Sequence, residues 1–145
     1  MDMFMGSYDH RIDNKGRLVM PAKFRSQMGD TVVCTVGLDN CLAVYPMDAW
    51  NVYLQKLQSL PFTKGQARQF MRTLLGAAEE LPVDGQGRIL LSAKLRKYAL
   101  LSDAVVVNGV NDHLEIWNSE KWAASNDEML ENFTSLAEGV SDLGV

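Results

Sequence analysis

The chain of 145 residues has little cysteine and no long apolar run, and these two shortages exclude several classes of protein. Its two cysteines, Cys34 and Cys41, have neither the spacing of a CxxC redox pair nor that of a zinc knuckle. We predict that both are buried and behave as small apolar side chains. No apolar run approaches the roughly 18 residues that a membrane span requires, and the N-terminus lacks the long apolar segment of a signal peptide. The sequence therefore predicts a cytoplasmic protein.

Sequence signatures of catalysis are also missing. The chain contains no G-x-S-x-G, Walker or H-E-x-x-H motif. Its two histidines, His10 and His113, have no cysteine or serine partner at a recognisable spacing, and we interpret His10 as a surface or DNA-proximal residue. We predict that the protein is not an enzyme and that it uses no catalytic residue, metal, cofactor or small-molecule substrate.

Basic residues are a minority, but they are concentrated in two places. The chain has 14 Lys and Arg against 18 Asp and Glu, and a net charge of −4 by itself argues against nucleic acid as a partner. Residues 10–25 and 83–97 nevertheless hold nine of the fourteen bases and only two of the eighteen acids. After Lys121 there are five acids and no base. We expect phosphate to be bound by the two basic stretches and avoided by the tail.

The two basic stretches are copies of one another. Residues 12–25 align without a gap on residues 83–96, with identical Asp, Gly, Arg, Ala, Lys and Arg at matched positions. After one extra residue in the second copy the correspondence continues and places Trp50 over Trp122. The chain therefore contains two whole modules.

Each module has the same order of predicted elements: a short strand, an Asp-x-x-Gly-Arg turn, a strand, a short helix and a β-hairpin. Gly16 and Gly87 supply the positive φ of a tight turn, and Asp13 and Asp84 can accept hydrogen bonds from the turn backbone. These four residues are the predicted turn-structuring set.

The remaining elements follow from local signals. The short helix begins with Pro21 in its first turn in one copy and with Ser92 as N-cap in the other. β-branched runs and their return strands predict two hairpins, and periodic apolar residues predict further helices. The hairpins are expected at residues 31–45 and 103–117, and the further helices around Trp50, at 63–77 and from Ser119.

The basic turns could serve DNA binding. Lys15, Arg17 and Arg88 would project from a β-hairpin, because a two-stranded ribbon fits the major groove and arginine can contact guanine with two hydrogen bonds. In the other interpretation, Asp13 pairs with Arg17 and Asp84 with Arg88 only to lock the turns, and the other bases are a solvated face. The two interpretations are compatible, since the carboxylates need not engage every basic residue nearby.

The motif also resembles a known family. An Asp-x-x-Gly-Arg turn followed by an apolar strand and by residues 21–25 (PAKFR) resembles the SpoVT/AbrB-like swapped-hairpin domain. The tandem copy, the segment 6–25, the pair Tyr45 and Trp50, and the segment 115–122 (EIWNSEKW) together resemble the MraZ family over nearly the whole chain. The resemblance implies an α+β fold of two pseudo-symmetric AbrB-like modules, packed as a β-barrel-like core with flanking helices. The expected ranges are 5–50 for module 1, 51–77 for connecting helices, 78–122 for module 2 and 123–145 for a C-terminal helix and acidic tail.

The resemblance further implies a function. Members of the family regulate transcription in bacteria, usually as repressors of the operon for cell division and cell-wall synthesis that includes their own gene. The implied partners are double-stranded DNA at promoter direct repeats and further copies of the chain in a ring, with the protein associated with the nucleoid. A ring would raise avidity, because a single turn offers few cations. The expected DNA contacts are Lys15, Arg17 and Lys23, followed by Arg11, Arg25, Arg88, Lys94 and Arg96. Gln86 replaces Lys15 in the second copy, so the first module is expected to dominate.

Two alternatives to this function stay open. An AbrB-like antitoxin would carry one hairpin module and a disordered tail, whereas residues 119–136 predict an amphipathic helix. A protein-interaction ring would use the basic turns on acidic protein surfaces. Under that interpretation the aromatic residues would form an interface, although core packing between modules is the simpler explanation and the one we favour. These aromatic residues are Trp50, Tyr53, Trp117 and Trp122.

Overall fold

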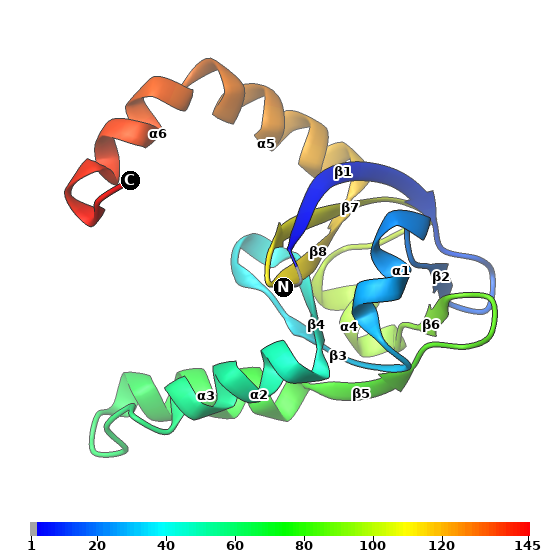
Figure 1. Ribbon diagram of the computed structural model, residues 1–145, viewed down its shortest axis with the longest axis horizontal. Helices are drawn as coiled ribbons and strands as arrows, with labels where there is room; N and C mark the ends of the chain where they lie inside the picture. Colours follow the sequence, from blue (N-terminus) through cyan, green and yellow to red (C-terminus); the bar gives the residue numbers. More distant parts are fainter. Residues whose placement is uncertain (1–2) are drawn as a thin grey trace.

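A six-stranded antiparallel sheet forms the centre of the fold in the computed structural model, which describes residues 3–145 (Figure 1). The order across the sheet is β1-β7-β8-β4-β3-β5. These strands are β1 (Phe4–Arg11), β7 (Ala104–Asn111), β8 (His113–Asn118), β4 (Leu42–Pro46), β3 (Thr31–Val36) and β5 (Glu79–Pro82). A separate two-stranded ribbon consists of β2 (Arg17–Val19) and β6 (Arg88–Leu90). Both predicted hairpins, β3–β4 and β7–β8, are present.

Helices flank the sheet and the ribbon. They are α1 (Ala22–Met28), α2 (Met47–Leu57), α3 (Gly65–Ala77), α4 (Ala93–Tyr98), α5 (Ser119–Glu131) and α6 (Phe133–Gly139), with short 3₁₀ turns at Leu38–Asn40 and Ser141–Leu143. Ser92 caps α4 as predicted, because its hydroxyl accepts a hydrogen bond from the Leu95 N–H. Pro21 occupies the N-cap position of α1, one residue earlier than predicted. None of the helices within residues 3–145 is long and apolar enough to cross a membrane.

The two modules are interlocked. The first strand of module 1, β1, pairs along its whole length with β7 of module 2, while β5 of module 2 pairs with β3 of module 1. The ribbon joins the modules once more, since β2 pairs with β6. The predicted α+β class is confirmed. Within residues 3–145, however, β1 and β5 remain the edges of the sheet, so the barrel-like core is not closed into a barrel.

The main core lies between the ribbon, the short helices and the sheet. Leu18 and Ile89, at the centres of the two ribbon strands, are buried. Phe24 of α1 packs edge-on against Phe4 and Tyr8 of β1, with ring centroids 5.4 and 5.3 Å apart. The core therefore fixes the ribbon and the short helices to the sheet that the two modules share.

The two cysteines are buried and free, as the sequence predicted. Burial raises the pKa of the Cys41 thiol to about 12, and the pKa of Cys34 is also raised, chiefly by burial. Both thiols are therefore protonated at neutral pH and act as apolar groups.

The aromatic residues Trp50, Tyr53, Trp117 and Trp122 form two clusters. Trp50 packs with Tyr45 and Tyr53, whereas Trp117 packs against Trp122 with the rings tilted and their centroids 5.2 Å apart. Trp50 and Trp117 are buried. Core packing accounts for the cluster around Trp50.

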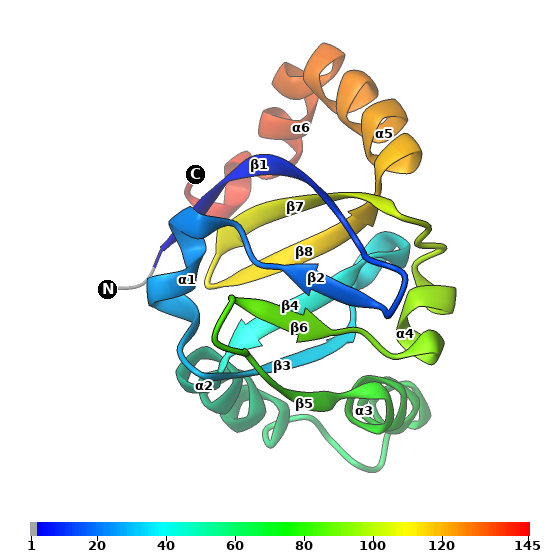
Figure 2. The same cartoon turned by 90° about the vertical axis from the view of Figure 1, so that its right-hand side faces the viewer.

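The C-terminal segment differs from the expected single helix over residues 119–136. It forms α5 and α6, separated at Asn132, and neither helix has a buried residue. Figures 1 and 2 show the two helices projecting away from the sheet as an arm. We call residues 123–143 the C-terminal arm.

Candidate nucleic-acid interface

Each basic turn is organised by one aspartate. Asp13 Oδ1 accepts hydrogen bonds from the backbone N–H groups of Lys15 and Arg17, each at 2.9 Å, and Asp13 Oδ2 accepts one from Arg17 Nε at 2.7 Å. Asp84 makes the same three contacts with Gln86 and Arg88, at 2.9, 2.9 and 2.7 Å. Local sequence dictates this geometry, because every partner lies within four residues of the aspartate.

These contacts stabilise the ionised carboxylates. The hydrogen bond from the Arg17 backbone N–H, together with the Arg17 side chain and the Lys15 N–H, lowers the pKa of Asp13 to about 2 against a smaller opposing effect of burial. The pKa of Asp84 is lowered in the same way, first by the backbone N–H of Arg88 and then by its side chain. Both aspartates are therefore charged at neutral pH and hold the guanidinium groups in fixed planes.

Asp13→Asn is expected to lower the melting temperature at pH 7 and to have little effect near pH 2. A carboxyl whose folded pKa is depressed stabilises the fold above its unfolded pKa, and this contribution disappears as pH falls from about 4 towards 2. Thermal unfolding followed by circular dichroism across this range measures the difference. Asp127→Asn, on the exposed arm, is the matched control. An equal loss for Asp13→Asn at pH 2 and pH 7 would contradict the assignment.

An arginine of the opposite module supports each turn. Arg25 Nε donates to the Met20 carbonyl at 2.9 Å, and a Cβ built on Gly87 would lie 2.7 Å from the same nitrogen. Arg96 Nε donates to the Leu91 carbonyl at 3.1 Å, and a Cβ built on Gly16 would lie 3.1 Å from the same carbonyl oxygen, which is tighter than an ordinary contact. Both glycines also have positive φ, which is +77° at Gly87 and +84° at Gly16. Glycine is required at both turns for two separate reasons.

The ribbon presents two arginines outward. In the antiparallel register Arg17 lies opposite Leu90, and Arg88 lies opposite Val19. Because side chains alternate along a strand, these four residues share the face opposite to buried Leu18 and Ile89. Figure 2 looks onto this face, with the turn that contains Asp13 at one end and the turn that contains Asp84 at the other.

Leu90 is a surface residue that the sequence reasoning missed. Its side chain is 56% exposed beside Arg17, although it occupies an apolar strand. The period-two alternation around Ile89 was a usable signal, because a buried Ile89 places its neighbours on the outer face. An exposed leucine between two arginines offers an apolar contact surface.

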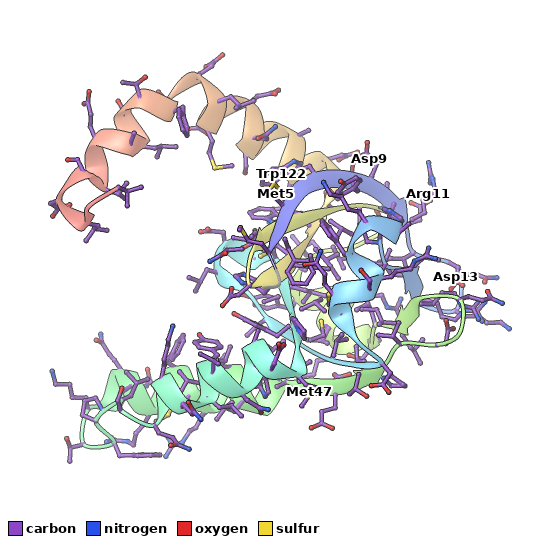
Figure 3. The ribbon with its side chains drawn as sticks, in the orientation of Figure 1. Met5, Asp9, Arg11, Asp13, Met47 and Trp122 are labelled. Carbon is purple, nitrogen blue, oxygen red and sulfur yellow. The ribbon has the colours of Figure 1, made fainter. Side chains whose placement is uncertain are left out.

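The other expected contact residues occupy different surroundings. Arg11 pairs with Asp103 of the opposite module at 2.7 Å, and both side chains are exposed. Lys15 and Lys23 are exposed, on the first turn and on α1. Lys94 instead lines a cavity between α3 and α4. Figure 3 shows Asp13 and Arg11 on the side of the molecule away from the C-terminal arm, so the acidic segment lies far from the turns.

His10 lies close to this region and is held neutral. Its partial burial, followed by the positive charge of Arg25, lowers its pKa below the usual 6.5. No group of three His, Cys, Asp or Glu side chains within residues 3–145 is arranged to hold a metal ion. The chemistry of the region is that of cations and exposed apolar side chains.

Comparison with known proteins identifies the family. The family described as "MraZ protein, putative antitoxin-like" matches residues 3–73 and again residues 74–142. The chain belongs to the MraZ family. The resemblance predicted from the tandem motif is confirmed, and so is the presence of two tandem copies. The ranges expected for the individual modules stay a prediction.

Relatives cover almost the whole chain. Transcriptional regulator MraZ of Desulforamulus reducens is 50% identical over 141 residues, which make up 97% of this chain and 99% of that protein. The proteins of the same name from Moorella thermoacetica and Ligilactobacillus salivarius are both 49% identical, and each alignment covers at least 97% of this chain and 98% of the relative. These MraZ family members are named as regulators of transcription and not as enzymes.

Proposed function

We propose that this protein regulates transcription by binding specific double-stranded DNA through the β2–β6 ribbon and its two turns. The observation that carries the proposal is the pair of aspartate-anchored arginines, Arg17 and Arg88, on the outward face of a short antiparallel ribbon. The names of the relatives support the regulatory role.

The ribbon suits the reading of base edges. A two-stranded ribbon fits the major groove, and each aspartate engages only the Nε side of its arginine, so that the Nη groups can donate to O6 and N7 of guanine. Val19 and exposed Leu90 would contact thymine methyl groups. The anchoring also reduces the rotamer entropy that binding would otherwise cost.

Phosphate contacts would come from the surrounding cations. Lys15 and Lys23 are exposed beside the first turn, and Arg11 lies at the end of β1. Arg25 and Arg96 support the turns through Nε and would contribute charge from their outer nitrogens. Lys94 faces the cavity beside α3, so we expect it to contribute least. Gln86 in place of a lysine makes the second turn the weaker one.

We further propose that the protein represses the operon for cell division and cell-wall synthesis that contains its own gene. It would act at the nucleoid as a ring of copies bound to promoter direct repeats. One ribbon presents few cations, and binding that depends on few phosphate contacts is weak at cellular salt. A ring would place several ribbons on one rigid body, and repeated DNA sites would then be bound with greater avidity.

Arg17→Ala is expected to weaken binding to the DNA upstream of the chain's own gene by about 10-fold to 100-fold, the loss typical of one bidentate base contact. Gel-shift titrations at several salt concentrations, with unrelated DNA as competitor, measure both affinity and specificity. Lys56→Ala removes one cation from α2 and is the matched control, expected to bind like the wild type. Equal affinity for unrelated DNA, or an Arg17→Ala variant that binds like the wild type, would refute the proposed interface.

A further inference from the structure

A cavity of about 370 Å³ lies between α3 and the sheet, beside β4 and β8. This volume is within the usual range of small-molecule sites, and apolar or aromatic side chains form most of the wall. Leu38 and Phe70 of the wall are 75% and 40% exposed, so the cavity opens to solvent. Phe70 lies one helical turn before buried Leu74, with which the periodicity of α3 groups it. The cavity is therefore large and open enough to admit a small molecule.

Four aromatic rings line this cavity. Tyr45 packs on Tyr53 with their ring centroids 5.5 Å apart and their planes 27° from parallel. The Tyr98 hydroxyl donates a hydrogen bond to the Gly37 carbonyl at 2.9 Å, which holds the Tyr98 ring in place. The faces of such rings carry partial negative charge and attract cations. We call the four rings the aromatic cage; they belong to Tyr45, Tyr53, Phe70 and Tyr98.

The charged side chain of the cavity is acidic. Among the described residues that line it, Glu115 is the one carboxylate, and none is a lysine or an arginine. Glu115 is half-buried, and its Oε1 accepts a hydrogen bond from Trp117 Nε1 at 2.9 Å, so the carboxylate has a fixed position. His113 also lines the cavity, and its Nδ1 lies 2.7 Å from Asp112 Oδ1, so protonation of this ring adds no uncompensated charge.

The tyrosines of the cage also lie in a negative field. Burial, followed by Tyr53 and then by Asp112 and Glu115, raises the pKa of Tyr45 far above its usual value. Burial, followed by Cys41 and Asp39, raises the pKa of Tyr98. Both hydroxyls therefore stay protonated at neutral pH, and the neighbouring carboxylates disfavour any further negative charge.

An adjoining cavity has the opposite sign. It has a volume of about 350 Å³, lies between α3 and α4 and shares Tyr98 with the first cavity. Arg72 and Lys94 line this second cavity and do not line the first. The negative character of the first cavity is thus a property of the aromatic cage and Glu115, and not of the whole region around α3.

We propose that the aromatic cage and Glu115 form a binding site for a small organic cation, an amine or quaternary ammonium that carries an apolar group. The positive nitrogen would lie against Glu115 and the rings, and the apolar group would cover Leu38 and Phe70. A carboxylate and aromatic faces together favour an ammonium group, because each stabilises positive charge and neither requires the cation to keep a full hydration shell. A bare metal ion fits poorly, since one carboxylate supplies too few ligands.

Three probes that share a benzene ring and differ in charge test the proposal. They are benzyltrimethylammonium, neutral benzyl alcohol and anionic phenylacetate, each titrated into the intact chain by isothermal calorimetry. We expect the cation to bind at least about 10-fold more tightly than either of the other probes, the difference typical of one charged contact with aromatic support.

Two substitutions assign the preference to the cavity. Glu115→Gln removes the charge while its amide oxygen can still accept the Trp117 hydrogen bond, and we expect about 10-fold weaker binding of the cation with unchanged binding of benzyl alcohol. Glu120→Gln removes an exposed carboxylate outside the cavity and is the matched control. Phe70→Leu replaces one ring of the cage by an aliphatic group and is expected to weaken binding of the cation by about 3-fold. Circular dichroism is expected to show that all three variants fold.

Contrary results are specific to this site. Equal affinity for the three probes, no binding of the cation, or a Glu115→Gln variant that binds the cation as the wild type does would each overturn the proposal. None of these results bears on the DNA interface, because neither Glu115 nor Phe70 belongs to the ribbon or its turns. The gel shift with Arg17→Ala tests that interface separately.

Discussion

Phe24→Ala is expected to lower the free energy of unfolding by about 4 kcal/mol, the usual cost of removing a buried phenylalanine. Phe24 is 1% exposed and packs edge-on against Phe4 and Tyr8, so its loss leaves a cavity beneath β1. Because β1 joins the sheet by pairing with β7 of the other module, the loss of packing destabilises both modules. Urea unfolding measures the change, which is large relative to the roughly 5–15 kcal/mol of a typical domain.

The control for this variant comes from the repeat itself. Leu95 occupies the matching position of the second module and is equally buried, so Phe24→Leu is expected to cost only about 1 kcal/mol. Both variants should unfold in a single transition with an unchanged dependence on urea, because interlocked strands prevent one module from unfolding alone. Two separate transitions would show that the modules are independent.

Gly109→Ala is expected to lower the free energy of unfolding by about 3 kcal/mol, at the upper end of the range for overpacking. A Cβ on Gly109 would lie 2.4 Å from the backbone nitrogen of Met5 and 2.6 Å from the carbonyl carbon of Phe4. Backbone atoms cannot rotate away as a side chain can, so β1 would have to separate from β7. Its register partner Gly6, with φ of +101°, shows how closely the two strands approach.

Gly76→Ala is the matched control for this variant. Its added methyl group contacts no neighbour, and it replaces glycine inside α3, so stability should rise by up to about 1 kcal/mol. Urea unfolding of both variants under one set of conditions provides the comparison. A Gly109→Ala protein as stable as the wild type would mean that β1 moves freely over β7.

The sequence predicted the local features of the candidate interface well. Asp13 and Arg17 lie four residues apart, and so do Asp84 and Arg88, so each turn closes on itself whatever surrounds it. The hairpins, the cap at Ser92 and the buried cysteines also follow from short-range patterns. The expectation of one continuous C-terminal helix was wrong, because the break at Asn132 carries no strong sequence signal.

What the sequence by itself determined was therefore the repeat, the chemistry of its two turns and the concentration of positive charge around them. Only the tertiary structure decided which strands pair. The two modules carry equivalent strands, so local sequence preference cannot determine whether a strand pairs within its own module or with the other module. That choice sets Arg17 opposite Leu90 and Arg25 against Gly87, and both contacts join distant parts of the chain. The two cavities beside α3 and the exposure of α5 and α6 were decided at the same level, since burial depends on where whole elements pack.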